Sequence, residues 1–234
     1  MPEAPDVGAA AGADVLGEVG VGPWDGPWPS GPGGEPDTRY DARLLTEGDR
    51  RNVVDRYRYW TREAIVADLD TRRHEFHVGV ENWGHDLNIG SVIRTANAFN
   101  AAAFHIVGRR RWNRRGAMVT DRYQHEQHHP DVADLRRWSE AHGIPLIGID
   151  NLPGSTALET ADLPRRCLLL FGQEGPGLSA GARDASAAVL HITQFGSTRS
   201  LNAGAAAAIA MHAWVRRHVF GQEIGQGDDA APRP

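Results

Sequence analysis

Several residue types are scarce or missing in this chain of 234 residues, and each absence excludes a class of site. Lysine is absent, so all 25 basic side chains are arginine. A phosphate-binding loop that ends in Gly-Lys-Ser or Gly-Lys-Thr is therefore excluded. The single cysteine, Cys167, excludes an internal disulfide and any zinc or iron–sulfur site built from several cysteines. We expect Cys167 to be a small core residue.

Long apolar segments are missing as well. No apolar run approaches the ~20 residues of a membrane-spanning helix, and the N-terminus lacks a basic region followed by an apolar one. We therefore expect a soluble, cytoplasmic protein with no membrane partner.

The net charge of −5 conceals a basic central region. Between Arg39 and Phe220 the sequence has 24 arginines and 20 acidic residues, a net charge of +4, and no basic side chain precedes Arg39. The nucleotide composition of the source genome is one explanation of this arginine bias, and RNA binding is another. Physically, arginine presents a planar fork of donors that suits phosphate groups and stacks on bases.

Residues 1–45 are predicted to be a disordered acidic tail. They are rich in Gly, Pro and Ala, and they contain too few apolar residues to offset the entropy of ordering. Trp24 and Trp28 interrupt this composition, either as incidental aromatics or as a docking peptide; we favour the first.

Residues 46–73 are predicted to be an N-terminal helical extension. Thr46 can cap a helix that runs to Asp70, with apolar residues at helical spacing on one face and arginines on the other. The arginine face is either a solvated surface or an arm that contacts RNA. The main domain is predicted over 74–220, and a second flexible tail over 221–234.

Short apolar segments alternate with helical patterns through the main domain. This alternation predicts an α/β fold with three layers, in which helices cover both faces of a parallel sheet. The predicted strands are 76–80, 104–107, 145–149, 168–172 and 189–192. The predicted helices are 89–100, beginning at an Asn88 cap, 131–142, 179–187 and 202–218.

Three segments rich in small residues lie where a predicted strand gives way to a helix. They are Asn88–Ala96 (NIGSVIRTA), Leu170–Ser179 (LFGQEGPGLS) and Ser200–Ala207 (SLNAGAAA). Ligands of α/β proteins bind at such positions. Taken singly, each segment also fits a structural role: a surface ion pair for Arg94, a tight turn at Gly172, and a helix cap at Ser200. The glycine spacing does not fit a dinucleotide fingerprint.

The three segments, in this order, resemble the motifs of the SpoU/TrmH family of RNA 2'-O-ribose methyltransferases, within the SPOUT superfamily. The resemblance covers roughly Glu75 to His218. It implies a C-terminal deep trefoil knot, S-adenosylmethionine as cofactor, and a homodimer that completes its site across the interface. This chain has Ile192-Thr193-Gln194 where the family commonly has Ile-Pro-Met.

The resemblance also implies roles for residues. Arg94 corresponds to the principal catalytic residue of the family, and Asn88, Glu174, Ser200 and Asn202 to groups that orient the reactants. Arginine is a poor general base because its pKa exceeds about 12, so electrostatic stabilisation or a phosphate anchor is the better role for Arg94. The predicted cofactor-binding residues are Ile149, Gly172, Glu174, Gly177, Ile192, Phe195, Gly196, Ser200 and Leu201.

A run of arginines is predicted to bind RNA. Five arginines flank one tryptophan, which suits a phosphate backbone plus one stacked base, although a solvated loop has the same composition. The residues are Arg109, Arg110, Arg111, Trp112, Arg114 and Arg115. The nearby His125, His128 and His129 lack a clear carboxylate or thiol partner, so no metal site is predicted.

The function that follows is S-adenosylmethionine-dependent methylation of a ribose 2'-hydroxyl in structured RNA. We expect tRNA rather than rRNA, because only a helix and a tail precede the main domain. The alternatives are a SPOUT enzyme that methylates a base, and a non-catalytic RNA-binding module of the same fold.

Overall fold

The computed structural model describes residues 20–84 and 88–222. Contacts divide the chain into two units, residues 1–61 and residues 62–234. Those parts of the two predicted tails that cover residues 1–19 and 223–234 lie outside the described residues. Across the described ranges, no helix is both long enough and apolar enough to cross a bilayer.

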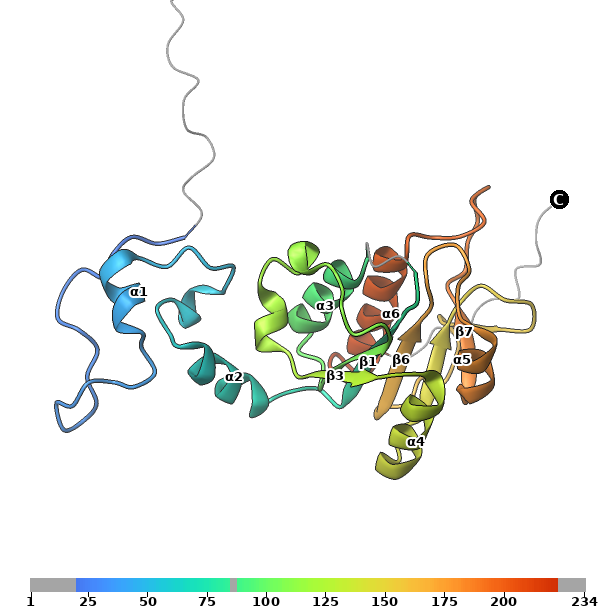
Figure 1. The fold of residues 1–234 in the computed structure, drawn as a ribbon, viewed down its shortest axis with the longest axis horizontal. Helices are drawn as coiled ribbons and strands as arrows, with labels where there is room; N and C mark the ends of the chain where they lie inside the picture. The colour runs from blue at the N-terminus through green and yellow to red at the C-terminus, as the bar shows by residue number, and fades with distance from the viewer. Residues whose placement is uncertain (1–19, 85–87, 223–234) are drawn as a thin grey trace, which may run out of the picture. The chain divides into compact units, whose positions relative to one another are not determined.

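The larger unit contains a seven-stranded sheet in which every neighbouring pair is parallel (Figure 1). The strand order is β3-β2-β1-β6-β4-β7-β5. The strands are β1 Phe76–Asn82, β2 Phe104–Gly108, β3 Glu126–His129, β4 Leu146–Ile149, β5 Thr156–Ala157, β6 Cys167–Phe171 and β7 Ala188–His191. The predicted parallel α/β sheet is thus confirmed. Strands β3 and β5 were not predicted.

Helices cover both faces of this sheet (Figure 1). The central strand β6 shows how: Cys167, Leu169 and Phe171 pack into one core, and Leu168 and Leu170 into the other, as the period of two requires. The first core also contains residues of α3 and α6, and the second residues of α4 and α5. These helices are α3 Ile89–Ala98, α4 Val132–His142, α5 Ala180–Ala185 and α6 Ala203–His218.

The prediction of one helix over residues 46–70 is wrong. The structure has α1 Ala42–Glu47, a 3-10 turn η1 Asp55–Tyr57, and α2 Arg62–Asp70. Asp41, rather than Thr46, caps α1. Helix α1 ends because Gly48 adopts φ +89°, a left-handed conformation that glycine tolerates best. The apolar spacing through this region therefore reflects burial in a compact fold, not one long helix.

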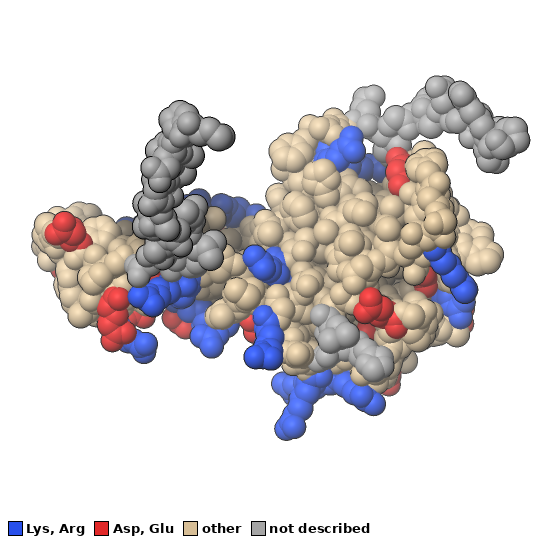
Figure 2. All heavy atoms as spheres, turned by 90° about the horizontal axis from the view of Figure 1, so that it is seen from above, with Lys and Arg blue, Asp and Glu red and all other residues tan. Residues whose placement is uncertain are grey.

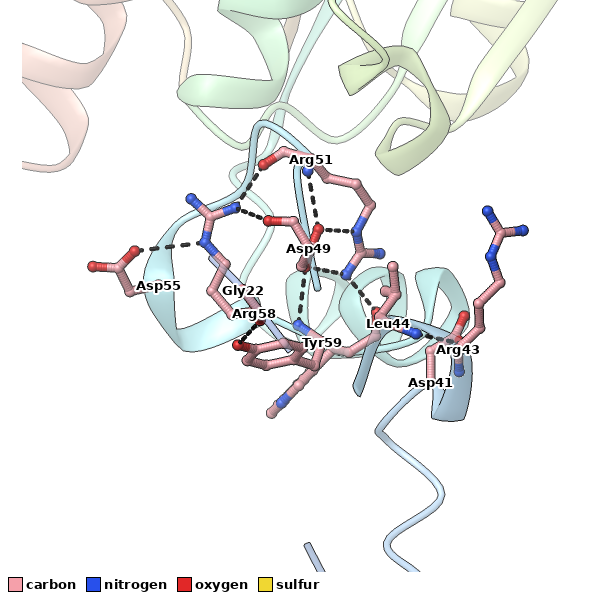
Figure 3. A network of polar contacts seen from close by, with 10 residues as sticks. Gly22, Asp41, Arg43, Leu44, Asp49, Arg51, Asp55, Arg58 and Tyr59 are labelled. Carbon is pink, nitrogen blue, oxygen red and sulfur yellow. Dashed lines mark hydrogen bonds and ion pairs between the residues drawn. The ribbon is translucent and has the colours of Figure 1, made fainter. Parts of the chain in front are cut away.

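The smaller unit is organised around the carboxylate of Asp49, which is fully buried (Figure 3). It accepts hydrogen bonds from the guanidinium and amide of Arg51 and from the amide of Tyr59. Burial alone raises the pKa of Asp49, but these hydrogen bonds outweigh it and hold the pKa below its ordinary value. Asp49 therefore remains an anion within a fold of very few secondary-structure elements.

Residues 20–45 belong to this fold, so the predicted tail over 1–45 is wrong for this part. Trp24 packs edge-on against Tyr59, with ring centroids 5.3 Å apart, and its amide donates to the carbonyl of Leu45. Val21 and Asp49 form an antiparallel bridge. Composition misled here because aromatic rings such as Trp24 and Tyr59, together with the buried ion pair of Asp49 and Arg51, replace the aliphatic residues of an ordinary core.

A chain of three imidazoles crosses strands β1, β2 and β3. His77 Nδ1 lies 3.0 Å from His105 Nε2, His105 Nδ1 lies 3.0 Å from His129 Nε2, and His129 Nδ1 lies 2.9 Å from Asp134 Oδ2. Trp138 of α4 packs on all three rings. Burial lowers the pKa of His77 to about 4, and the charge of Arg166 adds to this effect. Burial also lowers the pKa of His105 well below its ordinary value. His77 and His105 are therefore held neutral.

We expect these histidines to make the larger unit less stable in acid. Because the folded pKa of His77 lies below the ordinary 6.5, the unfolded chain binds this proton more readily between pH 6.5 and 4. The stabilisation is complete above about pH 6.5 and is lost as pH falls toward 4, with about 3 kcal/mol as the upper limit for this one group. Urea denaturation followed by circular dichroism at pH 7.5, 6.5 and 5.5 measures it. His77→Gln should show a shallower pH dependence, and an unchanged slope would contradict the assignment.

Candidate active site

A pocket of about 320 Å³ opens at the carboxyl ends of β4 and β6, where parallel sheets present their loops. Its walls come from the loops that follow β4, β6 and β7 and from the first turn of α6. The lining residues are Ile149, Asp150, Asn151, Phe171, Gly172, Gln173, Glu174, Gly175, Gly177, Ile192, Gln194, Ser200, Leu201, Asn202, Ala203 and Ala206.

The loop after β6 is a tight hairpin. Gln173 and Gly177 exchange two backbone hydrogen bonds of 3.1 and 3.0 Å. A Cβ atom at Gly172 would lie 2.1 Å from the carbonyl carbon of Gly177, so only glycine fits there. Asp150 fixes the far end, because its Oδ2 accepts from the amide of Leu178 at 2.8 Å. The glycine-rich sequence is therefore required by close backbone approach.

Three side chains from the three predicted segments meet in one hydrogen-bonded triangle. Asn88 Nδ2 donates to Glu174 Oε2 at 2.8 Å. Asn202 Nδ2 donates to Asn88 Oδ1 at 3.0 Å and to Glu174 Oε1 at 3.3 Å. The prediction that these residues lie together is confirmed by these contacts. Each of the three side chains hydrogen-bonds to the other two, which fixes the relative positions of the three loops.

The helix caps differ from expectation. Asn202, not Ser200, caps α6, because its Oδ1 accepts from the amides of Gly204 and Ala205. Ser200 instead lines the pocket. Asn88 precedes α3 but makes no side-chain cap, since its amide group is engaged with Glu174 and Asn202.

The predicted cofactor-binding residues fall into two groups. Seven of them line the pocket: Ile149, Gly172, Glu174, Gly177, Ile192, Ser200 and Leu201. Phe195 and Gly196 do not; Phe195 is 97% exposed, and nothing lies within 4 Å of a Cβ built at Gly196. The structure therefore places these two residues outside the pocket wall, although Gln194 and Ser200 of the same loop line the pocket.

Arg94 is exposed on α3 and does not line the pocket. It lies four residues after Gly90, and residues at this spacing share one face of a helix. Gly90 packs against Gly116 and Ala117 of the 3-10 turn η2 Arg114–Ala117, so closely that a Cβ at Gly90 would lie 2.6 Å from Gly116 Cα. Arg94 therefore lies about one turn beyond the contact of α3 with η2, and Asn88 joins the start of this helix to the pocket.

The arginine run after β2 is only partly available to a ligand. Trp112, which was predicted to stack on a base, is 9% exposed and belongs to the hydrophobic core. Arg114 stacks on Trp112 and pairs with Asp121 and Glu126. By contrast, Arg109, Arg110, Arg111 and Arg115 are exposed, and Figure 2 shows basic side chains standing out from the larger unit.

Several residues that shape this site were not predicted. Buried Asn82 donates from Nδ2 to the carbonyls of Arg109 and Arg111, and so holds the basic loop. Buried Glu81 accepts from the amide of Ser179, the cap of α5. Asp150 and Gln194 line the pocket. The one available signal was position: Glu81, Asn82 and Asp150 are polar residues at or just after the carboxyl end of an apolar strand.

The three histidines near β3 have protein partners. His125 contacts Asp70, His128 contacts the carbonyl of Gly108, and His129 contacts His105 and Asp134. In the part of the chain that the structure describes, no group of three or more His, Cys, Asp or Glu side chains is arranged to hold a metal ion.

Comparison with known proteins places these features in one family. The model of the SpoU rRNA methylase family matches residues 75–212. An uncharacterized tRNA/rRNA methyltransferase of Mycolicibacterium vanbaalenii is 29% identical over 141 residues, which are 57% of this chain and 44% of that protein. One from Mycobacterium bovis is 29% identical over 186 residues, 76% of this chain and 56% of that protein. The chain thus spans about half the length of the curated relatives it matches.

Solved structures give the same match. The SpoU methyltransferase AviRb from Streptomyces viridochromogenes, solved with its cofactor AdoMet, has a TM-score of 0.58 and 28% identity, over 66% of this chain and 65% of that one. An AdoMet-bound rRNA methyltransferase from Sinorhizobium meliloti has a TM-score of 0.56 and 25% identity, over 65% of this chain and 60% of that one.

We expect Gly172→Ala to disrupt the pocket. The new methyl group would overlap the backbone of Gly177 and Leu178, which cannot move without breaking the hairpin, so we expect a loss of about 1–3 kcal/mol in unfolding free energy. Thermal and urea denaturation measure this. Gly196→Ala is the matched control, because its methyl group would enter open space. Equal stability of the two variants would contradict the close approach seen at Gly172.

Proposed function

This chain belongs to the SpoU rRNA methylase family, and we propose that it is an S-adenosylmethionine-dependent methyltransferase acting on a ribose 2'-hydroxyl of structured RNA. The observation that supports this most directly is the triangle of Asn88, Glu174 and Asn202, which joins the three motif segments at the wall of one pocket. The exposed arginines of the basic loop suit the phosphate backbone of an RNA substrate, and we further propose that this RNA is a tRNA.

The pocket fits S-adenosylmethionine in size and in charge. Its volume of about 320 Å³ lies in the range of small-molecule sites. Its lining contains the carboxylates of Asp150 and Glu174 and no basic side chain, which suits a ligand that carries a sulfonium and an ammonium group against one carboxylate. The side-chain oxygen of Gln194 is buried and accepts no hydrogen bond from the described residues, so it can accept one from a ligand.

When bound, the cofactor supplies an electrophilic methyl group. The residues of this chain then have distinct tasks. Ser200 and Asn202, at the pocket wall, orient the reactants. Arg94 remains cationic and is suited to anchor the phosphate next to the target ribose and to stabilise negative charge that develops on the 2'-oxygen. Positioning of this kind contributes roughly 7–11 kcal/mol in favourable cases.

The remaining expectations are part of the same proposal. The family implies a deep trefoil knot and a homodimer. The outer faces of α3 and α6 support the dimer, since they expose Ser91, Ala205 and Ile209, which are small or apolar. We also retain as proposals a main domain over 74–220 and a cytoplasmic location.

Nucleoside analysis tests the reaction. Purified protein is incubated with S-adenosylmethionine labelled at the methyl group and with tRNA and rRNA fractions from a strain that lacks the gene, and the RNA is digested to nucleosides. We expect label in a 2'-O-methylated nucleoside of the tRNA fraction. Label in a base would replace the proposal with base methylation. No transfer, together with no binding of S-adenosylmethionine by calorimetry, would indicate a non-catalytic RNA-binding protein.

We expect Arg94→Ala to reduce the single-turnover rate of methyl transfer by about 100-fold or more, the size of effect seen when one oxyanion-stabilising group is removed. Its affinity for S-adenosylmethionine, measured by calorimetry, should stay unchanged because Arg94 does not line the pocket. Arg183→Ala, at an exposed arginine on α5, is the control and should retain the full rate. A normal rate for the Arg94 variant would remove this residue from the mechanism.

A further inference from the structure

Two consecutive residues between η2 and η3 Thr120–Tyr123 have an unusual backbone. Met118 has φ +48° and Val119 has φ +69°. Residues other than glycine rarely adopt this left-handed backbone conformation, and a β-branched valine there is an outlier. Such strain persists only where the surroundings impose it, and it tends to cluster at functional sites.

The residues on either side of this turn are buried, whereas the side chains of Met118 and Val119 are exposed. Ala117 and Thr120, on either side, are buried, and the Thr120 hydroxyl donates to the Ala117 carbonyl at 2.6 Å. Met118 and Val119 are nevertheless 52% and 45% exposed. The strained backbone therefore presents two apolar side chains to solvent instead of burying them.

This turn, the Met118–Val119 tip, is attached to the helix that carries the proposed catalytic arginine. Gly116 and Ala117 pack on Gly90 at the beginning of α3, and Arg94 lies one helical turn further along the same face. Figure 1 shows the two short green helical turns, η2 and η3, beside α3. The tip is thus placed close to where the target ribose must lie if Arg94 anchors its phosphate.

The charges around the tip are positive. Arg115 precedes it and Arg122 follows it, both exposed and with no ion-pair partner among the described residues. The nearby acidic side chains of Asp121 and Glu126 are already paired with Arg114. Two apolar side chains flanked by unpaired arginines are a poor binding surface for a protein that has no strong negative charge. They suit an RNA segment whose bases are unstacked.

We propose that Met118 and Val119 form an apolar wedge that packs against the base of the target nucleotide, or enters the gap it leaves, and holds it out of its stack beside Arg94. The proposal rests on the proposed function, because it requires RNA at this face. A ribose inside a stacked strand presents its 2'-hydroxyl beside the neighbouring phosphate, and unstacking gives the enzyme access to it. Apolar side chains inserted between bases are a known means of unstacking nucleic acid.

The test uses an RNA hairpin with a seven-nucleotide loop that contains 2-aminopurine, whose fluorescence rises when it leaves a stack. The variant is Met118→Asn with Val119→Asn, because asparagine tolerates the left-handed conformation and preserves the turn. Val54→Asn, at an exposed valine of the smaller unit, is the control. Thermal denaturation and light scattering confirm that each protein keeps its fold and its oligomeric state. Hairpin affinity is measured at two salt concentrations.

We expect the wild type and Val54→Asn to increase the fluorescence several-fold on binding, and the double variant to bind within about threefold of the wild-type affinity but with little fluorescence change. Methyl transfer to the tRNA fraction should then fall at least tenfold in the double variant. Equal fluorescence changes in all three proteins would overturn the wedge. It would also be overturned if the double variant changed its oligomeric state but unstacked the probe as well as the wild type does. If the wild type transfers methyl groups but never unstacks the probe, the wedge fails and the proposed function stands. If the wild type binds no RNA, both fail.

Discussion

The candidate site depends on one set of contacts, the hydrogen-bonded triangle of Asn88, Glu174 and Asn202. Its bonds join residues that are 86, 114 and 28 positions apart in the chain. Each bond contributes only about 1 kcal/mol to stability, but together they fix three loops relative to one another. The carboxylate of Glu174 lies where α3 and α6 both begin, and the partial positive charge at helix N-termini favours an anion there. Asn202 contributes twice, since it caps α6 with its oxygen and holds the other loops with its nitrogen.

Much of this arrangement was predictable from the sequence. The buried strand Cys167–Phe171 is continuously apolar, which is typical of a parallel strand covered on both faces. The segments that begin at Asn88, Leu170 and Ser200 lie at or beyond the carboxyl ends of the parallel strands β1, β6 and β7, so their meeting at one edge follows from the parallel topology. Local rules could not assign the individual bonds. Ser200 is as good a cap as Asn202 by type, and only the folded chain shows that Asn202 is the residue in position.

The errors have a common cause, which is that polar and aromatic residues can build a core. Trp112 looked like a surface aromatic within an arginine run, but Arg114 stacks on it and is neutralised by Asp121 and Glu126. Strand β3 reads Glu-Gln-His-His and has no apolar alternation, yet His129 is buried because His105 and Asp134 satisfy its ring. In the smaller unit, Asp49 takes the place of an apolar core residue. Composition and hydrophobic periodicity indicate where apolar side chains are buried. They therefore do not predict cores that are stabilised by ion pairs and by packed aromatic or imidazole rings.

Helix α3 lies between two surfaces of opposite charge, and its sequence shows how one helix can contact both. The pocket lining carries the carboxylates of Asp150 and Glu174, whereas the basic loop exposes arginines. Asn88 ties the start of α3 to the pocket, and Gly90, two residues later, lets η2 approach the backbone of the same turn. A larger residue at position 90 would push η2 away and with it the tip formed by Met118 and Val119. The small residues of this motif therefore matter less as ligands than as the reason that a negatively charged pocket and a positively charged face can share one helix.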